Sequence, residues 1–328
     1  MTRRRCLVMK LTIVGLQSGP NLNGESYTDR LEMLAAQFDH AIHDNPGTDL
    51  VVFPELMTTP YFCPIDDQSF FELAEPLLGE TFTFFSQKAR DSGVYVVITI
   101  FEKYADDQNT SYYNTAIMIS DAGEYIGSYR KTHIPKLALP TLTTDETRYF
   151  KRGTEFPVFD VKGYKVGILI CFDRSFPEAA RALALQGAEL IIIPTAAGGE
   201  ERKAAWLSEC QARARENGLY VVGVNKAGDE TLKAEGRELT SRFFGLSCAF
   251  DPSGNAVQPH LDSEPWKHII LEIDGKKVEE QRNRLNFLDF LQGDLYHSYS
   301  SEVQKVRKYE IKRETVPLFG PKGVVTID

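Results

Sequence analysis

The chain has 328 residues and carries 37 Lys and Arg against 46 Asp and Glu, so its formal net charge is −9. Such an acidic chain repels phosphates, which excludes a general binder of nucleic acid or anionic membranes. Hydrophobic residues at 42% and aromatics at 11% exclude a disordered chain and indicate a packed globule.

The N-terminal segment begins with Arg3, Arg4 and Arg5 and then reaches an apolar run at residues 11–16. Polar residues follow this run at once, so it is shorter than the apolar core of an export signal and predicts a single buried strand. The sequence also lacks a run of about 18 apolar residues, which a membrane-spanning helix needs. We therefore expect a cytoplasmic protein without a membrane partner.

The first half of the chain alternates apolar runs with amphipathic stretches. Apolar side chains at helical spacing predict a helix over residues 26–44, which Pro46 and Gly47 end. Further along we predict a strand at 50–53, a helix at 81–91, a strand at 94–101, and a hairpin of residues 115–120 and 125–129.

The second half continues the alternation. A strand over 165–170 ends at Cys171, and Ser175 with Glu178 forms a predicted capping box for a helix over 179–186. The remaining predicted elements are a strand at 189–193, a helix at 202–217, a strand at 219–224, and a hairpin of residues 247–250 and 256–257.

This order of elements predicts an α/β fold. Short strands without polar alternation are typical of parallel sheets that helices cover on both faces. Although the length allows about two domains, we expect one domain over residues 1–275. The polar remainder, residues 276–328, is expected to pack on a neighbouring surface rather than form a core of its own.

Reactive side chains follow several of the predicted strands. In parallel α/β sheets, ligands bind beyond the carboxyl ends of the strands. Glu55, Cys171, Thr195 and Asn225 each follow an apolar strand, and Lys131 follows the first hairpin. An acid, a thiol and a cation are therefore expected at one edge.

Cys171 is the most informative of the five cysteines. It lies just before a predicted helix N-terminus, where the helix dipole and free amides favour a thiolate. The alternative is a buried structural thiol. Cys6 in the N-terminal tail, Cys210 in a predicted helix and Cys248 in a hairpin strand show no functional signal, whereas Cys63 is in a loop near Glu55, where it could line a pocket. Their odd number and scattered spacing exclude a disulfide framework.

Glu55 and Lys131 suit general-base and oxyanion-stabilising roles. Partial desolvation after an apolar strand would raise the pKa of Glu55 toward that of a general base. A fixed lysine charge would stabilise an oxyanion. The alternatives are a carboxylate paired at the rim and a solvated lysine. His133, two residues after Lys131, is the rival base for the thiol.

Nothing in the sequence indicates a cofactor or a metal. Phosphate-binding glycine motifs are missing from it, and His40 and His43, although on one helix face, lack a third ligand. The stretch Gly198-Gly199-Glu200 leads into a helix and is a candidate anion site. We expect a small-molecule substrate.

Three motifs together resemble the nitrilase, or carbon–nitrogen hydrolase, superfamily. They are VVFPE at residues 51–55, YRKTHIP at 129–135, and GILICFDR at 167–174, with FPEAAR at 176–181 and the stretch 185–195 continuing the match. The resemblance covers roughly residues 10–275 and implies a four-layer αββα sandwich that dimerises through an outer helix layer. It also implies a catalytic triad of Glu55, Lys131 and Cys171, with Glu146 as a second glutamate.

The motifs do not decide which branch of the family this chain resembles. The stretch 176–181 is similar to carbamoylases, and Arg174 stands where amino-acid carbamoylases hold the substrate carboxylate. Putrescine-type enzymes have Gln there, and D-specific amino-acid carbamoylases often have a second Arg where this chain has Ser175. Arg174 would otherwise pair with Asp173 or Glu178.

We therefore expect a thiol amidohydrolase of a small N-carbamoyl amino acid or related amide, acting as a homodimer or higher oligomer. The backbone of Phe172 would complete the oxyanion site, with Thr195 and Asn225 beside the substrate. The alternatives are hydrolysis of N-carbamoylputrescine, a neutral aliphatic amide or a nitrile, and a catalytically silent binding module.

Overall fold

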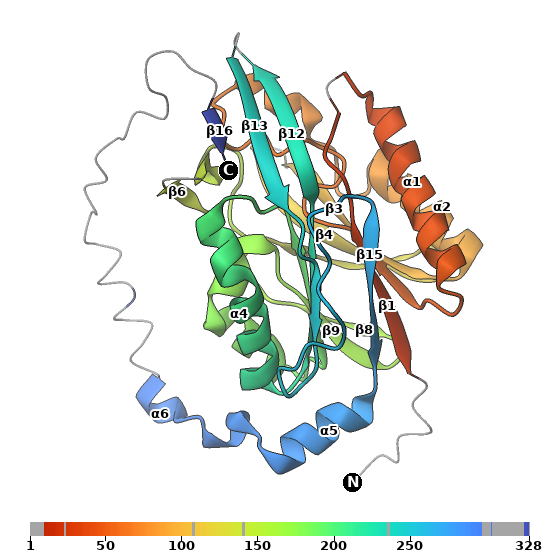
Figure 1. The fold of residues 1–328 in the computed structure, drawn as a ribbon, viewed down its shortest axis with the longest axis vertical. Coiled ribbons are helices and arrows are strands. Elements are labelled where there is room, and N and C mark those ends of the chain that lie inside the picture. Colours follow the sequence, from red (N-terminus) through yellow and green to blue (C-terminus); the bar gives the residue numbers. More distant parts are fainter. Residues whose placement is uncertain are drawn as a thin grey trace.

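Two β-sheets stacked face to face form the centre of the molecule (Figure 1). The computed structural model describes residues 10–22, 24–106, 109–139, 142–234, 237–296, 303 and 325–327. The larger sheet has the strand order β15-β1-β2-β3-β4-β5, and the smaller has the order β14-β11-β10-β9-β8.

Parallel strands occupy the middle of both sheets, and antiparallel strands flank them. The strands of the larger sheet are β1 (Leu11–Gln17), β2 (Leu50–Val52), β3 (Tyr95–Ala105), β4 (Thr110–Ile119), β5 (Tyr125–Arg130) and β15 (Lys267–Ile273). Those of the smaller are β8 (Val158–Val161), β9 (Tyr164–Ile168), β10 (Leu190–Thr195), β11 (Tyr220–Asn225) and β14 (Cys248–Phe250).

Helices cover the outer face of each sheet. In Figure 1, α1 (Tyr27–Asp44) and α2 (Glu80–Ser92) lie on one side of the molecule and α4 (Glu200–Asn217) lies on the other. The shorter α3 (Pro177–Leu185) packs beside α4. The layers run helix, sheet, sheet, helix, which confirms the expected four-layer αββα sandwich.

Local signals explain where the long helices begin and end. Ser26 caps α1 through its side chain and forms a capping box with Asp29. Gly93 and Gly218 end α2 and α4 in the left-handed conformation that glycine adopts without strain. These helices and the apolar strands lie within a few residues of their predicted positions.

The predicted capping box at Ser175 is wrong. The helix α3 begins at Pro177, and its N-cap residue, Phe176, makes no side-chain cap. Residues Cys171–Ser175 form a short 3-10 helix, η3, instead. The Asp173 carboxylate accepts a hydrogen bond from the Ile170 amide at 3.0 Å and so stabilises this extra turn directly after the strand. The predicted second arm of the last hairpin is reduced to a single bridge between Phe250 and Ala256.

Several elements were not predicted, among them β8 and β15. The others are β6 (Lys136–Leu139), β7 (Leu142–Asp145), β12 (Ala227–Ala234), β13 (Arg237–Phe244), β16 (Val325–Ile327), the 3-10 helices η1 (Gln68–Leu73), η2 (Glu146–Arg148) and η4 (Phe287–Phe290), and the helices α5 (Gly275–Arg284) and α6 (Gly293–Tyr296). Apart from β15, the strands among them are polar or very short. The β12–β13 hairpin bears charged side chains and lacks the apolar pattern of a buried strand.

The segment after residue 275 first packs on the chain's own domain. Val278 is buried in the core cluster that includes both sheets, and the Arg282 guanidinium donates to the Ala188 carbonyl at 2.7 Å. Cys6 and most of the chain beyond residue 296 lie outside the described residues. In the described part, no helix is both long and apolar enough to span a membrane.

Candidate active site

Four predicted residues meet at the carboxyl ends of the strands. Glu55 follows β2, Lys131 follows β5, Glu146 opens η2, and Cys171 opens η3 after β9. Glu55, Lys131 and Glu146 have no exposed surface, and Cys171 is 5% exposed. The site therefore joins loops from both sheets in an interior position.

Lys131 lies between the two glutamates. Its ammonium Nζ donates to Glu55 Oε1 at 2.7 Å and to Glu146 Oε1 and Oε2 at 2.9 and 2.8 Å. Burial lowers the pKa of Lys131, but the two carboxylates outweigh it and hold that pKa above its ordinary value. The lysine is consequently a permanent positive charge in the interior.

Glu55 is held on both oxygens by neighbouring groups. Its Oε1 also accepts from Asn114 Nδ2 at 2.7 Å, and its Oε2 accepts from the Ala196 amide at 2.8 Å. Burial raises the pKa of Glu55, but Lys131 and these hydrogen bonds outweigh burial and leave the pKa below its ordinary value. The expectation of a raised pKa is therefore wrong, because the carboxylate is paired with a lysine.

Glu146 has the opposite balance. Tyr61 donates to its Oε1 at 2.8 Å, and Lys131 contacts both oxygens. Burial raises the pKa of Glu146 to about 7 against the opposing effect of Lys131, and the charge of Glu55 adds to the rise. The two carboxylates compete for one lysine and titrate as a pair.

Cys171 lies at a sharp turn between β9 and α3. Its φ of 48° is in the left-handed region, which a residue with a side chain rarely adopts. Burial raises the pKa of its thiol to about 11, Glu55 adds to the rise, and Lys131 opposes it. The expected thiolate is therefore wrong: desolvation outweighs any effect of the short turn that Cys171 begins, and the resting thiol keeps its proton.

Asp173 connects the Cys171 turn to the segment after Lys131. Its carboxylate accepts from the Tyr129 hydroxyl at 2.7 Å and from the His133 amide at 2.8 Å, in addition to the Ile170 amide. The His133 ring lies 2.8 Å from the same carboxylate through Nδ1. His133 is thus engaged with Asp173 and does not line the pocket at Cys171.

Arg174 does not reach that pocket. It is fully buried, its Nε lies 2.9 Å from Glu209 Oε2, and its guanidinium stacks 4.6 Å from the centre of the Trp206 ring. Its Nη1 donates to the Cys171 carbonyl at 2.9 Å. The structure therefore corrects the expected contact with a substrate carboxylate, because the side chain lies outside the pocket wall and its Nε and Nη1 are engaged inside the protein.

Thr195 and Asn225 are buried behind the pocket rather than in its wall. Thr195 donates to the Ile193 carbonyl, whereas Asn225 holds Ala197 through two hydrogen bonds of 2.9 and 3.1 Å. Asn225 thereby positions the loop that lines the pocket. Cys63, also buried, is absent from the wall too.

Phe172 is the second residue of η3, and the first amides of a helical turn lack partners within that turn. Its backbone N–H therefore remains a predicted oxyanion donor. The Phe172 ring contacts the guanidinium of Arg202, whose Cζ lies 4.9 Å from the ring centre.

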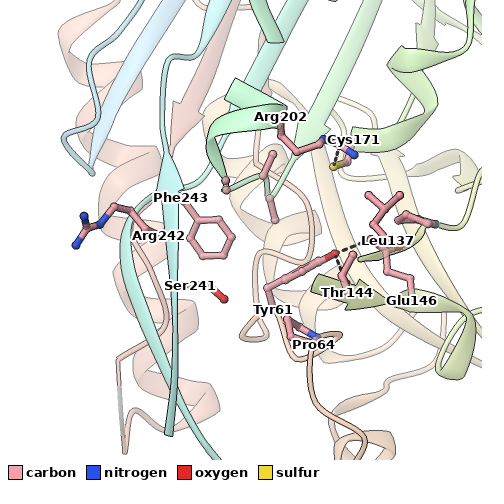
Figure 2. A pocket seen from close by; sticks show the side chains of 15 residues that line it. Tyr61, Pro64, Leu137, Thr144, Glu146, Cys171, Arg202, Ser241, Arg242 and Phe243 are labelled. Atoms are coloured by element: carbon pink, nitrogen blue, oxygen red, sulfur yellow. Dashed lines mark hydrogen bonds between the residues drawn. The ribbon is translucent and has the colours of Figure 1, made fainter. Parts of the chain in front are cut away.

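The pocket itself contains residues that sequence reasoning missed. Figure 2 shows Tyr61, Glu146, Cys171, Arg202 and Phe243 around it. Arg202 is the third residue of α4, and the loop before it contains the Gly198-Gly199 pair that was predicted as an anion site. That glycine pair was the available signal for Arg202. Within the described residues, three or more His, Cys, Asp or Glu side chains are nowhere grouped so as to hold a metal.

Comparisons with known proteins identify the family of this chain. The sequence model of the carbon-nitrogen hydrolase family matches residues 10–283. An N-carbamoylputrescine amidase of Solanum tuberosum is 33% identical to this chain, and the match covers 76% of this chain and 83% of the amidase. A citrullinase of Francisella tularensis is 32% identical, and the match covers 72% of this chain and 81% of the citrullinase. The crystal structure of a carbon-nitrogen hydrolase from Helicobacter pylori superimposes with a TM-score of 0.80 at 30% identity, covering 89% of this chain and 98% of that one.

Replacing Lys131 by methionine tests the buried charge cluster. The variant leaves two buried carboxylates without their cation, so we expect a loss of about 3–5 kcal/mol of unfolding free energy at pH 8. Without the lysine the pKa values of both carboxylates rise, and acid then neutralises them. The deficit should therefore shrink between pH 8 and pH 5.5, measured by urea unfolding.

The double variant Lys131→Met/Glu146→Gln is the control, since it removes one of the two stranded charges. It should recover part of the lost stability at pH 8. Equal stability of wild type and Lys131→Met at pH 8 would contradict the conclusion that Lys131 compensates two buried carboxylates.

Proposed function

Since this chain belongs to the carbon–nitrogen hydrolase family and is a hydrolase of amides, we propose that Cys171 is its nucleophile and a small N-carbamoyl amino acid or related amide its substrate. One observation carries the proposal: Lys131 bridges Glu55 and Glu146, and Glu146 and Cys171 line one pocket. Two of the relatives are named for ureido compounds, N-carbamoylputrescine and citrulline.

The first step forms a covalent bond to the enzyme. Glu55 accepts the thiol proton as Cys171 Sγ attacks the carbonyl carbon of the substrate. Because the thiol has a pKa of about 11 and Glu55 is held ionised by Lys131, proton transfer accompanies attack rather than preceding it. The protein stores no reactive thiolate when the pocket is empty.

The negative charge then develops on the carbonyl oxygen. Lys131 and the backbone N–H of Phe172 stabilise this oxyanion in a buried site where electrostatic interactions are strong. Glu55 returns the proton to the leaving nitrogen, and the C–N bond breaks. A thioester (a thiocarbamate for a carbamoyl substrate) remains on Cys171.

Water completes the reaction. Glu55 takes a proton from the water as its oxygen attacks the thioester carbon, and the C–S bond breaks. The proton returns to the sulfur and restores the thiol. Glu146 does not exchange protons in this scheme; its two contacts to Lys131 position the ammonium.

Cys171→Ala should abolish turnover, and acid-quenched wild type should carry an acyl or carbamoyl group on Cys171 by mass spectrometry. Glu55→Gln should lower kcat on the order of 10²–10⁴-fold, as expected for the loss of a general acid–base group. Ammonia release from N-carbamoyl amino acids measures both.

His133→Ala is the matched control, because the rival scheme uses this histidine as the base. We expect its rate to stay within about tenfold of wild type, since His133 contacts Asp173 and not the pocket. Loss of activity in His133→Ala with a fully active Glu55→Gln would overturn the assignment.

The pH profile tests Glu146. With a pKa of about 7, Glu146 is protonated below pH 7 and ionised above it, and only the ionised form offers both oxygens to Lys131. We therefore expect kcat/KM to rise through pH 7. In Glu146→Gln, kcat/KM should no longer rise through pH 7. Above pH 7 it should be lower than that of wild type on the order of 10²-fold, because Lys131 is displaced. If the variant kept the same rise of kcat/KM through pH 7, another group would be responsible for the rise.

We also propose that the protein is a cytoplasmic homodimer in which the segment beyond residue 275, after α5 has packed on its own domain, continues onto the second copy. Phe290 and Leu295 support this, since they are 69% and 67% exposed in the single chain. Sedimentation should show a dimer, and replacing both residues by serine should shift it toward monomer. A monomeric wild type would refute the proposal.

A further inference from the structure

The guanidinium of Arg202 faces the sulfur of Cys171. Its Nη2 lies 3.8 Å from Cys171 Sγ, and Figure 2 shows the side chain directed toward the cysteine. Gly199, the N-cap of α4 with a φ of 84°, turns the chain so that α4 begins at the pocket. Arg202 is only 9% exposed.

The charge of Arg202 has no acidic partner among the described residues. Glu200, two residues earlier, lies 3.3 Å from Lys203, and Glu55 and Glu146 share Lys131. The other arginine of the pocket wall, Arg242, pairs with Asp229 at 2.9 Å and extends away from Cys171 (Figure 2). A guanidinium that is largely desolvated gains most from a carboxylate, which accepts two parallel hydrogen bonds.

We infer that Arg202 holds the carboxylate of the substrate, so that the enzyme prefers acids in which this carboxylate lies about three bonds from the scissile carbon. The inference rests on the proposed function and replaces Arg174 in the predicted carboxylate site. It also disfavours a substrate with a cationic tail, which would meet the positive guanidinium.

The short distance sets the size of the substrate. When Cys171 attacks, the scissile carbon is bonded to a sulfur that lies 3.8 Å from Arg202. Two carbons separated by three bonds are about 3–4 Å apart, so an α-ureido acid can place its carboxylate against the guanidinium. In an acid with more bonds between the two carbons, the extended chain places the carboxylate beyond the guanidinium, so the chain has to bend to reach it.

The apolar walls strengthen this contact. Pro135, Leu137 and Phe243 line the same pocket, and a pocket with few polar groups excludes water from a charge-assisted hydrogen bond. The Phe172 ring beside the guanidinium supports its orientation.

The test compares three substrates: N-carbamoyl-DL-alanine, N-carbamoyl-β-alanine with one more bond, and ethylurea without a carboxylate. Wild type should show its highest kcat/KM on the first. Arg202→Gln should raise KM for N-carbamoyl-DL-alanine at least about tenfold, with less effect on kcat and none on ethylurea, because one charge-assisted pair is lost.

Two further variants complete the design. Arg202→Lys keeps the positive charge but loses the paired N–H donors of the guanidinium. Its KM for N-carbamoyl-DL-alanine should therefore lie between those of wild type and Arg202→Gln. Lys203→Gln removes a cation from the same turn but an exposed one, and should match wild type. Thermal unfolding of each variant shows whether it is folded.

The outcomes separate this inference from the proposed function. Equal wild-type kcat/KM on acid and ethylurea, or an equal fall of kcat on both in Arg202→Gln, would overturn the role of Arg202 while leaving the hydrolase intact. Turnover of simple aliphatic amides alone would do the same. If Cys171 takes up no acyl or carbamoyl group from any of these compounds, the proposed function itself fails.

Discussion

The buried ammonium of Lys131 is the interaction on which the site depends. A lysine without exposed surface is tolerated only when carboxylates compensate its charge, and here Glu55 and Glu146 both do so. These residues follow β2, β5 and β7, so one cation fixes three separate segments of chain. Glu55 extends the connection to the smaller sheet through the Ala196 amide. The charges that would perform the chemistry are also the ones that hold the loops together.

The same cluster contributes to keeping Cys171 a protonated thiol. Burial raises the pKa of Cys171, and the nearby charge of Glu55 raises it further. The neighbouring Lys131 offsets only part of this effect, since its influence on the thiol is smaller than that of burial. Asp173 holds the strained Cys171 turn against the segment that carries Lys131. Hydrogen bonds thus fix the geometry of the turn, while the thiol of Cys171 remains protonated.

Much of the site was readable from the residues because it follows a geometric rule. The carboxyl ends of neighbouring strands meet, so Glu55, Lys131 and Cys171 were expected together, and the motif resemblance added Glu146. Position did not reveal which groups face the cavity. The same rule places Thr195, Asn225 and Arg174 at or near the ends of strands. Their side chains nevertheless contact other parts of the protein and not the pocket. Arg202 comes from the third position of a helix, where spacing carries no such signal.

By itself, the sequence determined the alternation of buried strands and amphipathic helices, the ends of α1, α2 and α4, and the expectation that Glu55, Lys131 and Cys171 lie together, because these depend on local periodicity, caps and motifs. The tertiary structure decided the protonation of those residues and which of two arginines, Arg174 or Arg202, lines the pocket. Both depend on desolvation and on partners far away in the chain: Lys131 lies 76 positions from Glu55 and Arg202 lies 31 from Cys171. Such pairings exist only once the two sheets have stacked.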